Sequence, residues 1–169
     1  MLEQVILVDE NDQEIGTEEK IVAHRSGKLH RAFSIFIFNS QRELLLQQRA
    51  KTKYHSGGLW TNTCCGHPRP GEDTEISAHR RLREEMGFDC VLKKTFDFIY
   101  QVKLNDELFE HEFDHVFVGT SDQKPDPDPT EVEDWQWGSP DQIKNAIKEN
   151  PGKYTYWFTI AFAKLTARI

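Results

Sequence analysis

Short apolar runs rich in β-branched and aromatic residues alternate with polar turn residues along most of the chain. The runs are bounded by Asn-containing pairs at residues 11–12, 39–40 and 105–106, a pattern typical of β-strands separated by turns. The run Ala32–Phe38 is almost continuously apolar, which predicts a strand that is covered on both faces. The predicted strands are Val5–Val8, Ala32–Phe38, Leu44–Gln48, Phe96–Leu104, Leu108–Val118 and Val132–Trp137.

Three other segments carry the signals of helices. In Glu75–Met86 the apolar positions recur at three- and four-residue spacing, and Gly87 is a suitable stop. Ser139 is a suitable N-cap for a second helix whose first residue is Pro140, and a third helix is predicted over Tyr156–Leu165. The side chains expected on the buried helix faces are Ile76, His79, Leu82 and Met86, followed by Ile143 and Ile147.

The chain length and the order of these elements predict one domain. The Pro- and Asp-rich segment Asp122–Thr130 reads as a surface loop that is too short to link two domains, and the sequence shows no internal repeat. We therefore expect a single domain over residues 1–169 of the α/β (α+β) class, in which helices sandwich a mixed sheet.

The net charge of the chain limits the kinds of binding partner that we expect. The chain has 28 acidic residues against 21 Lys and Arg residues, a formal net charge of -7. This balance argues against a general nucleic-acid binder, whereas a local basic pocket can still bind a phosphorylated substrate. The acids are unevenly placed, because residues 105–134 have a net charge of -10 and the rest of the chain +3.

Processing signals and cysteine usage suggest a compartment. The first residues lack the basic start and long apolar run of a signal peptide, and no stretch approaches the roughly 18 apolar residues of a membrane helix. Cys64, Cys65 and Cys90 are odd in number, so we expect no disulfide framework. We expect a cytoplasmic protein without nucleic-acid, membrane or obligate protein partners.

A charged motif occupies the predicted helix after a glycine-containing loop. Arg81, Glu84 and Glu85 are three and four residues apart, so they share a helix face. Two carboxylates placed in this way can hold Mg²⁺ and bridge it to substrate phosphates. The alternative is an ordinary solvated face of charged side chains.

A second motif is Thr61-Asn-Thr-Cys-Cys-Gly-His-Pro68, directly before that helix. In an extended segment Cys64 and Cys65 point in opposite directions. A cysteine beside a Gly-His pair could be a nucleophile, a metal ligand or an acid/base group, although buried cysteines more often only pack.

A third motif is an acidic stripe in the predicted strand Leu108–Val118. Glu110, Glu112 and Asp114 would face one side, and His111 and His115 the other. If the acidic side faces inwards, a cation must neutralise it. Together with His24, His30 and His67, the inward-facing glutamates would suit a divalent ion such as Zn²⁺ or Mn²⁺. The alternative is that the acidic stripe is exposed and simply solvated. The aromatic residues Trp60, Tyr100, Tyr154, Tyr156 and Trp157 are expected mostly in the core.

Together these motifs resemble a known family. The chain from Gly66 to Phe88 is similar to the Nudix box, except that Arg81 stands where the box has a glutamate. The combination resembles the type I isopentenyl-diphosphate isomerases, a Nudix-fold family, over about Val5 to Trp157. The matching motifs are Glu19-Lys20 with His24, Leu29-His-Arg-Ala-Phe-Ser34, Gln48-Arg-Ala50, Gly58-Leu-Trp-Thr-Asn62, Cys65-Gly-His-Pro68, the altered box and Glu110-His-Glu112.

The resemblance implies a Nudix-type fold and the conversion of isopentenyl diphosphate to dimethylallyl diphosphate by protonation and deprotonation. It places Cys65 and Glu112 on opposite sides of the allylic unit, with Tyr100 assisting the glutamate. It assigns one divalent metal (Zn²⁺, Mn²⁺ or Mg²⁺) to His24, His30, His67, Glu110 and Glu112, and a substrate-borne Mg²⁺ to Glu85. The implied substrate-binding residues are Lys20, Arg49, Lys53, Arg81 and Trp157.

Two alternatives stay open. A Nudix pyrophosphohydrolase would use the same box, although Arg81 removes one of its carboxylates. A non-catalytic, metal-dependent binding module would retain a diphosphate without turnover, and would survive loss of Cys65.

Overall fold

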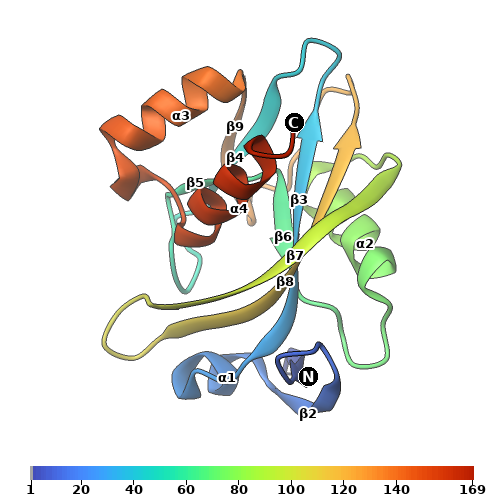
Figure 1. Cartoon of the computed structure of the whole chain (residues 1–169), viewed down its shortest axis with the longest axis vertical. Helices are drawn as coiled ribbons and strands as arrows, with labels where there is room; N and C mark the ends of the chain where they lie inside the picture. Colours follow the sequence, from blue (N-terminus) through green and yellow to red (C-terminus); the bar gives the residue numbers. More distant parts are fainter. Residues whose placement is uncertain (1) are drawn as a thin grey trace.

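A long central strand organises the molecule. In the computed structural model, which describes residues 2–169, β3 (His30–Phe38) lies at the centre of a nine-stranded mixed sheet (Figure 1). It runs parallel to β8 (Phe109–Thr120) and antiparallel to β6 (Cys64–Gly66). Its ends also pair with β1 (Gln4–Val8) and β4 (Leu44–Arg49).

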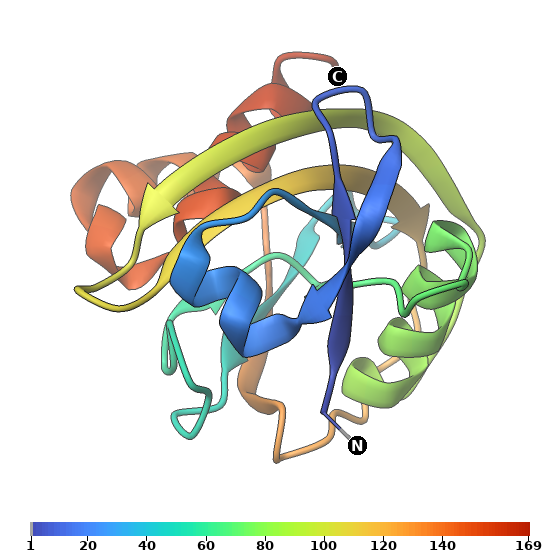
Figure 2. The ribbon, with the colours of Figure 1, turned by 90° about the horizontal axis from the view of Figure 1, so that it is seen from below.

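The remaining strands extend the sheet on either side of this centre. The longest, β7 (Leu92–Lys103), pairs antiparallel with β8 in a curved ribbon that Figure 2 shows from below. On the other side, β4 pairs with β9 (Val132–Gly138) and β5 (Trp60–Thr61). At the N-terminal end, β2 (Glu14–Glu19) forms a hairpin with β1 and leads into the short helix α1 (Lys20–Ser26).

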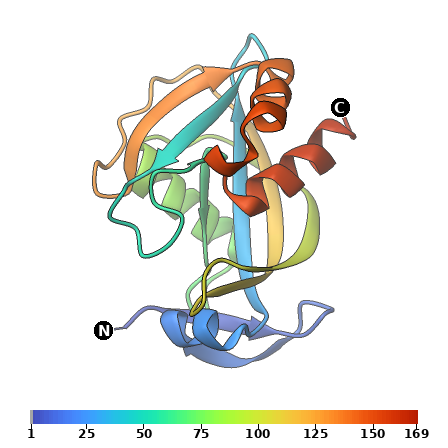
Figure 3. The same ribbon diagram turned by 90° about the vertical axis from the view of Figure 1, so that its left-hand side faces the viewer.

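Helices cover both faces of the sheet. The helix α2 (Thr74–Met86) packs on one face, where Phe33, Ile35 and Ile37 of β3 meet Leu82 and Met86. The other face is covered by α3 (Pro140–Glu149) and α4 (Tyr156–Thr166), joined by the 3-10 turn η1 (Pro151–Lys153), as Figure 3 shows. The apolar run in β3 is therefore buried on both sides, which confirms the predicted sandwich.

Local signals account for the ends of α2 and α3. Asp73 caps α2, and Gly87 ends it in the left-handed conformation (φ 74°). A side chain at Gly87 would also collide with the Asp126 carbonyl, 2.2 Å from the position of a Cβ atom. Ser139 and Gln142 form a reciprocal capping box at the start of α3, in which Pro140 occupies the first turn.

Three details differ from the sequence-based expectations. Ile76 is 62 % exposed, because six residues along a helix turn it roughly 240° away from Leu82. Tyr156 is exposed and not part of the core. The hairpin strand β2 and α1 were missed, because β2 has little apolar alternation and α1 is only seven residues long.

Within the described residues, none of the helices combines the length and the apolar character needed to cross a membrane.

Candidate active site

The register of three neighbouring strands brings a glutamate, a histidine and a tyrosine side by side. Glu112 of β8 is paired with His30 of β3 and with Tyr100 of β7. Paired residues of adjacent strands project to the same face. The Tyr100 hydroxyl accordingly donates a hydrogen bond of 2.8 Å to Glu112 Oε2.

The acidic stripe of β8 faces inwards, which decides between the two alternatives that the alternation left open. Glu110, Glu112 and Asp114 are all buried, with exposed fractions of 2 %, 7 % and 1 %. Asp114 accepts a hydrogen bond from the Ser34 hydroxyl. His111 points to the other face, where its Nδ1 lies 3.0 Å from the Gly27 carbonyl.

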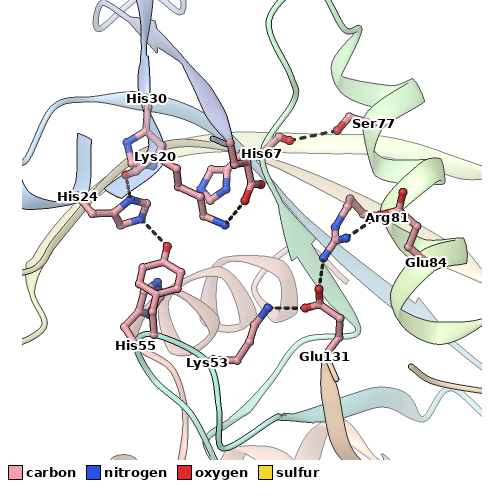
Figure 4. A network of polar contacts seen from close by, with 12 residues as sticks. Lys20, His24, His30, Lys53, His55, His67, Ser77, Arg81, Glu84 and Glu131 are labelled. Carbon is pink, nitrogen blue, oxygen red and sulfur yellow. Dashed lines mark hydrogen bonds and ion pairs between the residues drawn. The ribbon is translucent and has the colours of Figure 1, made fainter. Parts of the chain in front are cut away.

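Three imidazoles from separate segments, those of His24, His30 and His67, lie close together in Figure 4. They converge on Glu110 and Glu112. His24 Nε2 from α1 lies 3.0 Å from Glu110 Oε1, and His67 Nε2, just after β6, lies 3.0 Å from Glu112 Oε1. His30 Nε2 is 3.5 Å from that same Glu112 oxygen. Donor atoms of His24, His30, His67 and Glu112 all lie within 4.8 Å of one another.

Backbone carbonyls set the tautomers of two of these rings. His24 Nδ1 lies 2.7 Å from the Lys20 carbonyl, and His30 Nδ1 lies 2.9 Å from the Lys28 carbonyl. In a neutral ring Nδ1 therefore carries the proton, and Nε2 presents its lone pair to the cluster, as metal-binding histidines do. His30 Nε2 is buried and has no hydrogen-bond partner. This group of side chains could therefore hold a divalent metal ion.

The electrostatics of the buried glutamates agree with a cation site. Burial and the neighbouring Glu112 raise the pKa of Glu110 to about 7. Burial alone would raise the pKa of Glu112, but the neighbouring imidazoles of His30 and His67 hold that pKa well below its usual range. Burial lowers the pKa of His67 to about 3, so this ring is neutral near pH 7. Two buried carboxylates side by side are expensive without a compensating positive charge.

The two adjacent cysteines lie on opposite faces of β6. Cys64 pairs with Ile35 and is fully buried in the core beneath α2. Cys65 pairs with Ser34, is half-buried and lines the same cavity as Glu110 and Glu112. Burial raises the pKa of Cys65 to about 12, so the side chain is a thiol near neutral pH.

The cavity has a volume of about 590 Å³ including its open mouth. Its lining includes four cationic side chains, those of Lys20, Arg49, Lys53 and Arg81. Glu131 forms ion pairs with both Lys53 and Arg81, and its Oε1 lies 3.3 Å from Arg81 Nη2 (Figure 4). Lys20 Nζ lies 3.2 Å from Glu3 Oε2. Several anionic groups of the protein thus already contact the cations expected to bind phosphate.

The remaining expected site residues, Trp157 and Glu85, also line the cavity. Trp157 is buried, its Nε1 has no hydrogen-bond partner, and the Arg49 guanidinium carbon lies 5.4 Å from its ring centroid. Glu85 is buried and accepts hydrogen bonds from Gln47 and from Arg81. Glu84, the other acid of the box, is more exposed and pairs with Arg81 at 2.6 Å.

The sequence of this chain matches one domain family and is similar to named enzymes. The NUDIX domain family model matches residues 28–158. "Isopentenyl-diphosphate Delta-isomerase 1" of Aromatoleum aromaticum is 54 % identical over 167 residues, 99 % of this chain and 94 % of that protein. The isopentenyl-diphosphate Delta-isomerase of Serratia proteamaculans is 52 % identical over 99 % of this chain and 93 % of its own length. The chain belongs to the isopentenyl-diphosphate Delta-isomerase family.

Solved structures agree on the fold. DR0079 from Deinococcus radiodurans superposes with a TM-score of 0.74 at 23 % identity, covering 87 % of this chain and 90 % of that chain. The MutT protein from Methanosarcina mazei superposes with a TM-score of 0.68 at 18 % identity, covering 83 % and 94 %. The Nudix-type fold expected for this isomerase family is therefore confirmed.

Every residue that the resemblance placed in the site of an isomerase of this family lines the cavity or contacts the His/Glu cluster. Sequence reasoning missed His55, whose Nε2 lies 2.9 Å from Glu110 Oε1, and Glu131, which bridges two of the cations. His55 lies in the polar stretch 51–56, and no other potential metal ligand lies near it in the sequence at a motif-like spacing. Glu131 is one of many acids in residues 105–134, and no motif distinguishes it from the others.

Proposed function

We propose that this chain converts isopentenyl diphosphate into dimethylallyl diphosphate, a step that supplies isoprenoid precursors. The observation that supports this most directly is a thiol and a buried carboxylate, Cys65 and Glu112, in one cavity with four cationic side chains. A diphosphate needs the cations, and moving a double bond needs an acid and a base. Relatives of this name at 54 % and 52 % identity support the same assignment.

The reaction moves one double bond and exchanges two protons. A proton is added to the terminal alkene carbon, and another leaves the carbon that bears the diphosphate-linked CH₂ group, so the double bond shifts by one position. We assign these transfers to Cys65 and Glu112. Each turnover leaves the acid without its proton and the base with an extra one, so a proton must return before the next cycle. Tyr100 holds Glu112 through its hydrogen bond.

Protonating an unactivated alkene creates positive charge at its tertiary carbon, in a site from which water must be excluded. Trp157 is proposed to flank that charge. A cation–π contact contributes only about 0.5–2 kcal/mol, whereas enzymatic rate enhancements require roughly 8 kcal/mol or more. Placement of the acid and base must therefore supply most of the effect.

We assign a divalent cation, Zn²⁺, Mn²⁺ or Mg²⁺, to His24, His30, His67, Glu110 and Glu112, where it would neutralise the two buried carboxylates. Glu85 is proposed to hold Mg²⁺ that arrives with the substrate and offsets the diphosphate charge. Lys20, Arg49, Lys53 and Arg81 would orient the diphosphate.

The three cysteines are unpaired, which supports the expectation of a reducing, cytoplasmic setting.

Incubation with isopentenyl diphosphate and Mg²⁺ in D₂O tests this function. We expect dimethylallyl diphosphate that carries deuterium, detected by NMR or mass spectrometry. Absence of both product and exchange would reject the proposal. Release of phosphate or pyrophosphate from a nucleotide panel would instead identify a pyrophosphohydrolase, because isomerisation releases neither.

A further inference from the structure

His55 belongs to the loop between β4 and β5, yet its side chain is nearly buried, with 6 % exposed. Its Nε2 lies 2.9 Å from Glu110 Oε1. That same oxygen lies 3.0 Å from His24 Nε2. Two imidazole nitrogens from different segments therefore converge on one carboxylate oxygen, and no proton-transfer role given above uses His55.

The hydrogen bonds around these two rings favour tautomers whose Nε2 lone pairs point toward Glu110. The bond of His24 Nδ1 to the Lys20 carbonyl directs the unprotonated Nε2 of the neutral ring at Glu110. His55 Nδ1 lies 3.1 Å from the Ser56 hydroxyl, a partner for this nitrogen in the tautomer whose Nε2 is also unprotonated. Lone pairs would then face a carboxylate oxygen, an arrangement that a positive ion stabilises. Donor atoms of His24, His55 and Glu110 lie within 4.8 Å of one another.

We propose that His55 is an additional protein ligand of the divalent cation, which gives the site of this chain four imidazoles and two carboxylates. His24 belongs both to this group and to the group that contains His30, His67 and Glu112. Four neutral imidazoles add no charge, so the two carboxylates match the charge of one divalent ion. A nitrogen-rich donor set favours Co²⁺, Ni²⁺ or Zn²⁺ over Mg²⁺ and Mn²⁺.

This ligand ties the substrate-binding loop to the metal. Lys53, assigned to the diphosphate, lies two residues before His55 in the same loop, and Arg49 Nη2 donates a 3.3 Å hydrogen bond to the His55 carbonyl. The Tyr54 hydroxyl lies 3.4 Å from His24 Nε2. Metal binding through His55 would thus hold the wall of the cavity that carries Lys53.

The inference rests on the metal site of the proposed function but not on turnover, so it is tested by metal binding. The full chain is stripped with a chelator and titrated with Co²⁺, whose visible absorption reports its ligands. We expect His55→Gln to weaken binding at least 10-fold and to alter the Co²⁺ spectrum. Glutamine keeps an N–H donor for Glu110 but lacks the imidazole nitrogen. His79→Gln, on the far helix α2 where His79 pairs with Asp89, should bind Co²⁺ like the unmodified chain.

Imidazole rescue separates ligation from a structural effect. In His55→Ala, added imidazole should restore the Co²⁺ spectrum and most of the affinity, and unfolding of the metal-free variant by heat checks that it is folded. Unchanged affinity and spectrum in His55→Gln would overturn the role of His55 alone. Failure of the unmodified chain to bind Co²⁺ would reject the whole metal site, whatever the outcome of the isomerase assay.

Discussion

The Tyr100 hydroxyl donates a hydrogen bond of 2.8 Å to Glu112 Oε2, from the directly opposed position on the neighbouring strand. Burial raises the pKa of Tyr100 well above its usual value, so the hydroxyl remains a donor throughout the physiological range. A hydrogen bond to a charged group contributes about 1.5–3 kcal/mol. We expect Tyr100→Phe to lower kcat by roughly 10- to 150-fold.

Steady-state kinetics of the isomerase measure this effect. Tyr154→Phe is the matched control, since Tyr154 is partly buried and packs against the core on the same face of the sheet. A Tyr100→Phe variant that keeps full kcat would show that Glu112 needs no support from this hydroxyl.

The two adjacent cysteines should separate function from stability. We expect Cys65→Ala to abolish turnover with little change in stability, because Cys65 is half-buried at the cavity. Cys64→Ala should retain most turnover and lose about 1 kcal/mol of unfolding free energy, because its thiol fills space in the core. Turnover assays and urea unfolding of both variants test this. Equal loss of turnover in the two would mean that the wrong thiol had been assigned.

The raised pKa of Cys65 predicts how fast the thiol reacts at different pH values. The thiolate is the reactive form, so labelling by iodoacetamide follows its population. With a pKa of about 12, the labelling rate should rise roughly 10-fold per pH unit from pH 7 to 9.5 and reach no plateau. The measurement uses a Cys64→Ala/Cys90→Ala background and mass spectrometry. A plateau near pH 8.5 would show an ordinary, unburied thiol.

Glu131 forms ion pairs with two of the cationic side chains proposed to bind the diphosphate. It pairs with Lys53 and Arg81, which both line the cavity. Removing its charge should free both cations, so we expect Glu131→Gln to lower KM for isopentenyl diphosphate several-fold. Glu133→Gln is the control, since Glu133 only approaches the exposed Lys51 at 4.0 Å. An increase in KM would show that Glu131 holds the cations in place for the substrate.

The ion pair between Glu72 and Arg80 should make stability depend on acid pH. Hydrogen bonds from Arg80 lower the pKa of Glu72 to about 2. A carboxyl group with a lowered folded-state pKa stabilises the fold above its unfolded pKa, and this stabilisation disappears as the pH falls toward the folded value. We expect Glu72→Gln to cost about 1–2 kcal/mol at pH 7, a figure reduced for partial solvent exposure.

Urea unfolding at pH 7, 4.5 and 3 measures this dependence. The difference between Glu72→Gln and the unmodified chain should shrink from pH 4.5 downwards. Glu75→Gln, at the exposed start of the same helix, controls for the loss of one charge. A difference that stays constant to pH 3 would contradict the lowered pKa.

Local sequence determined much of the secondary structure. The apolar run of β3 and the helical spacing in α2, with its stop at Gly87, each depend on neighbours a few residues away. The alternation of Glu110 and Glu112 on one face of β8 likewise followed from the two-residue period of a strand. Where the signal was weak, as in β2 and α1, the elements were missed.

Motif spacing determined the family, because the Cys65-Gly-His-Pro68 segment, the altered box and the Glu110-His-Glu112 triplet occur together. Only the tertiary structure decided how these pieces meet. The parallel register of β3 and β8 sets His30 opposite Glu112, eighty-two residues away in the sequence. The loop before β5 carries His55 to Glu110, and the loop before β9 carries Glu131 to Lys53 and Arg81. Local periodicity determines which way a side chain points, whereas its partners across the sheet depend on long-range register and packing, which no short stretch of sequence encodes.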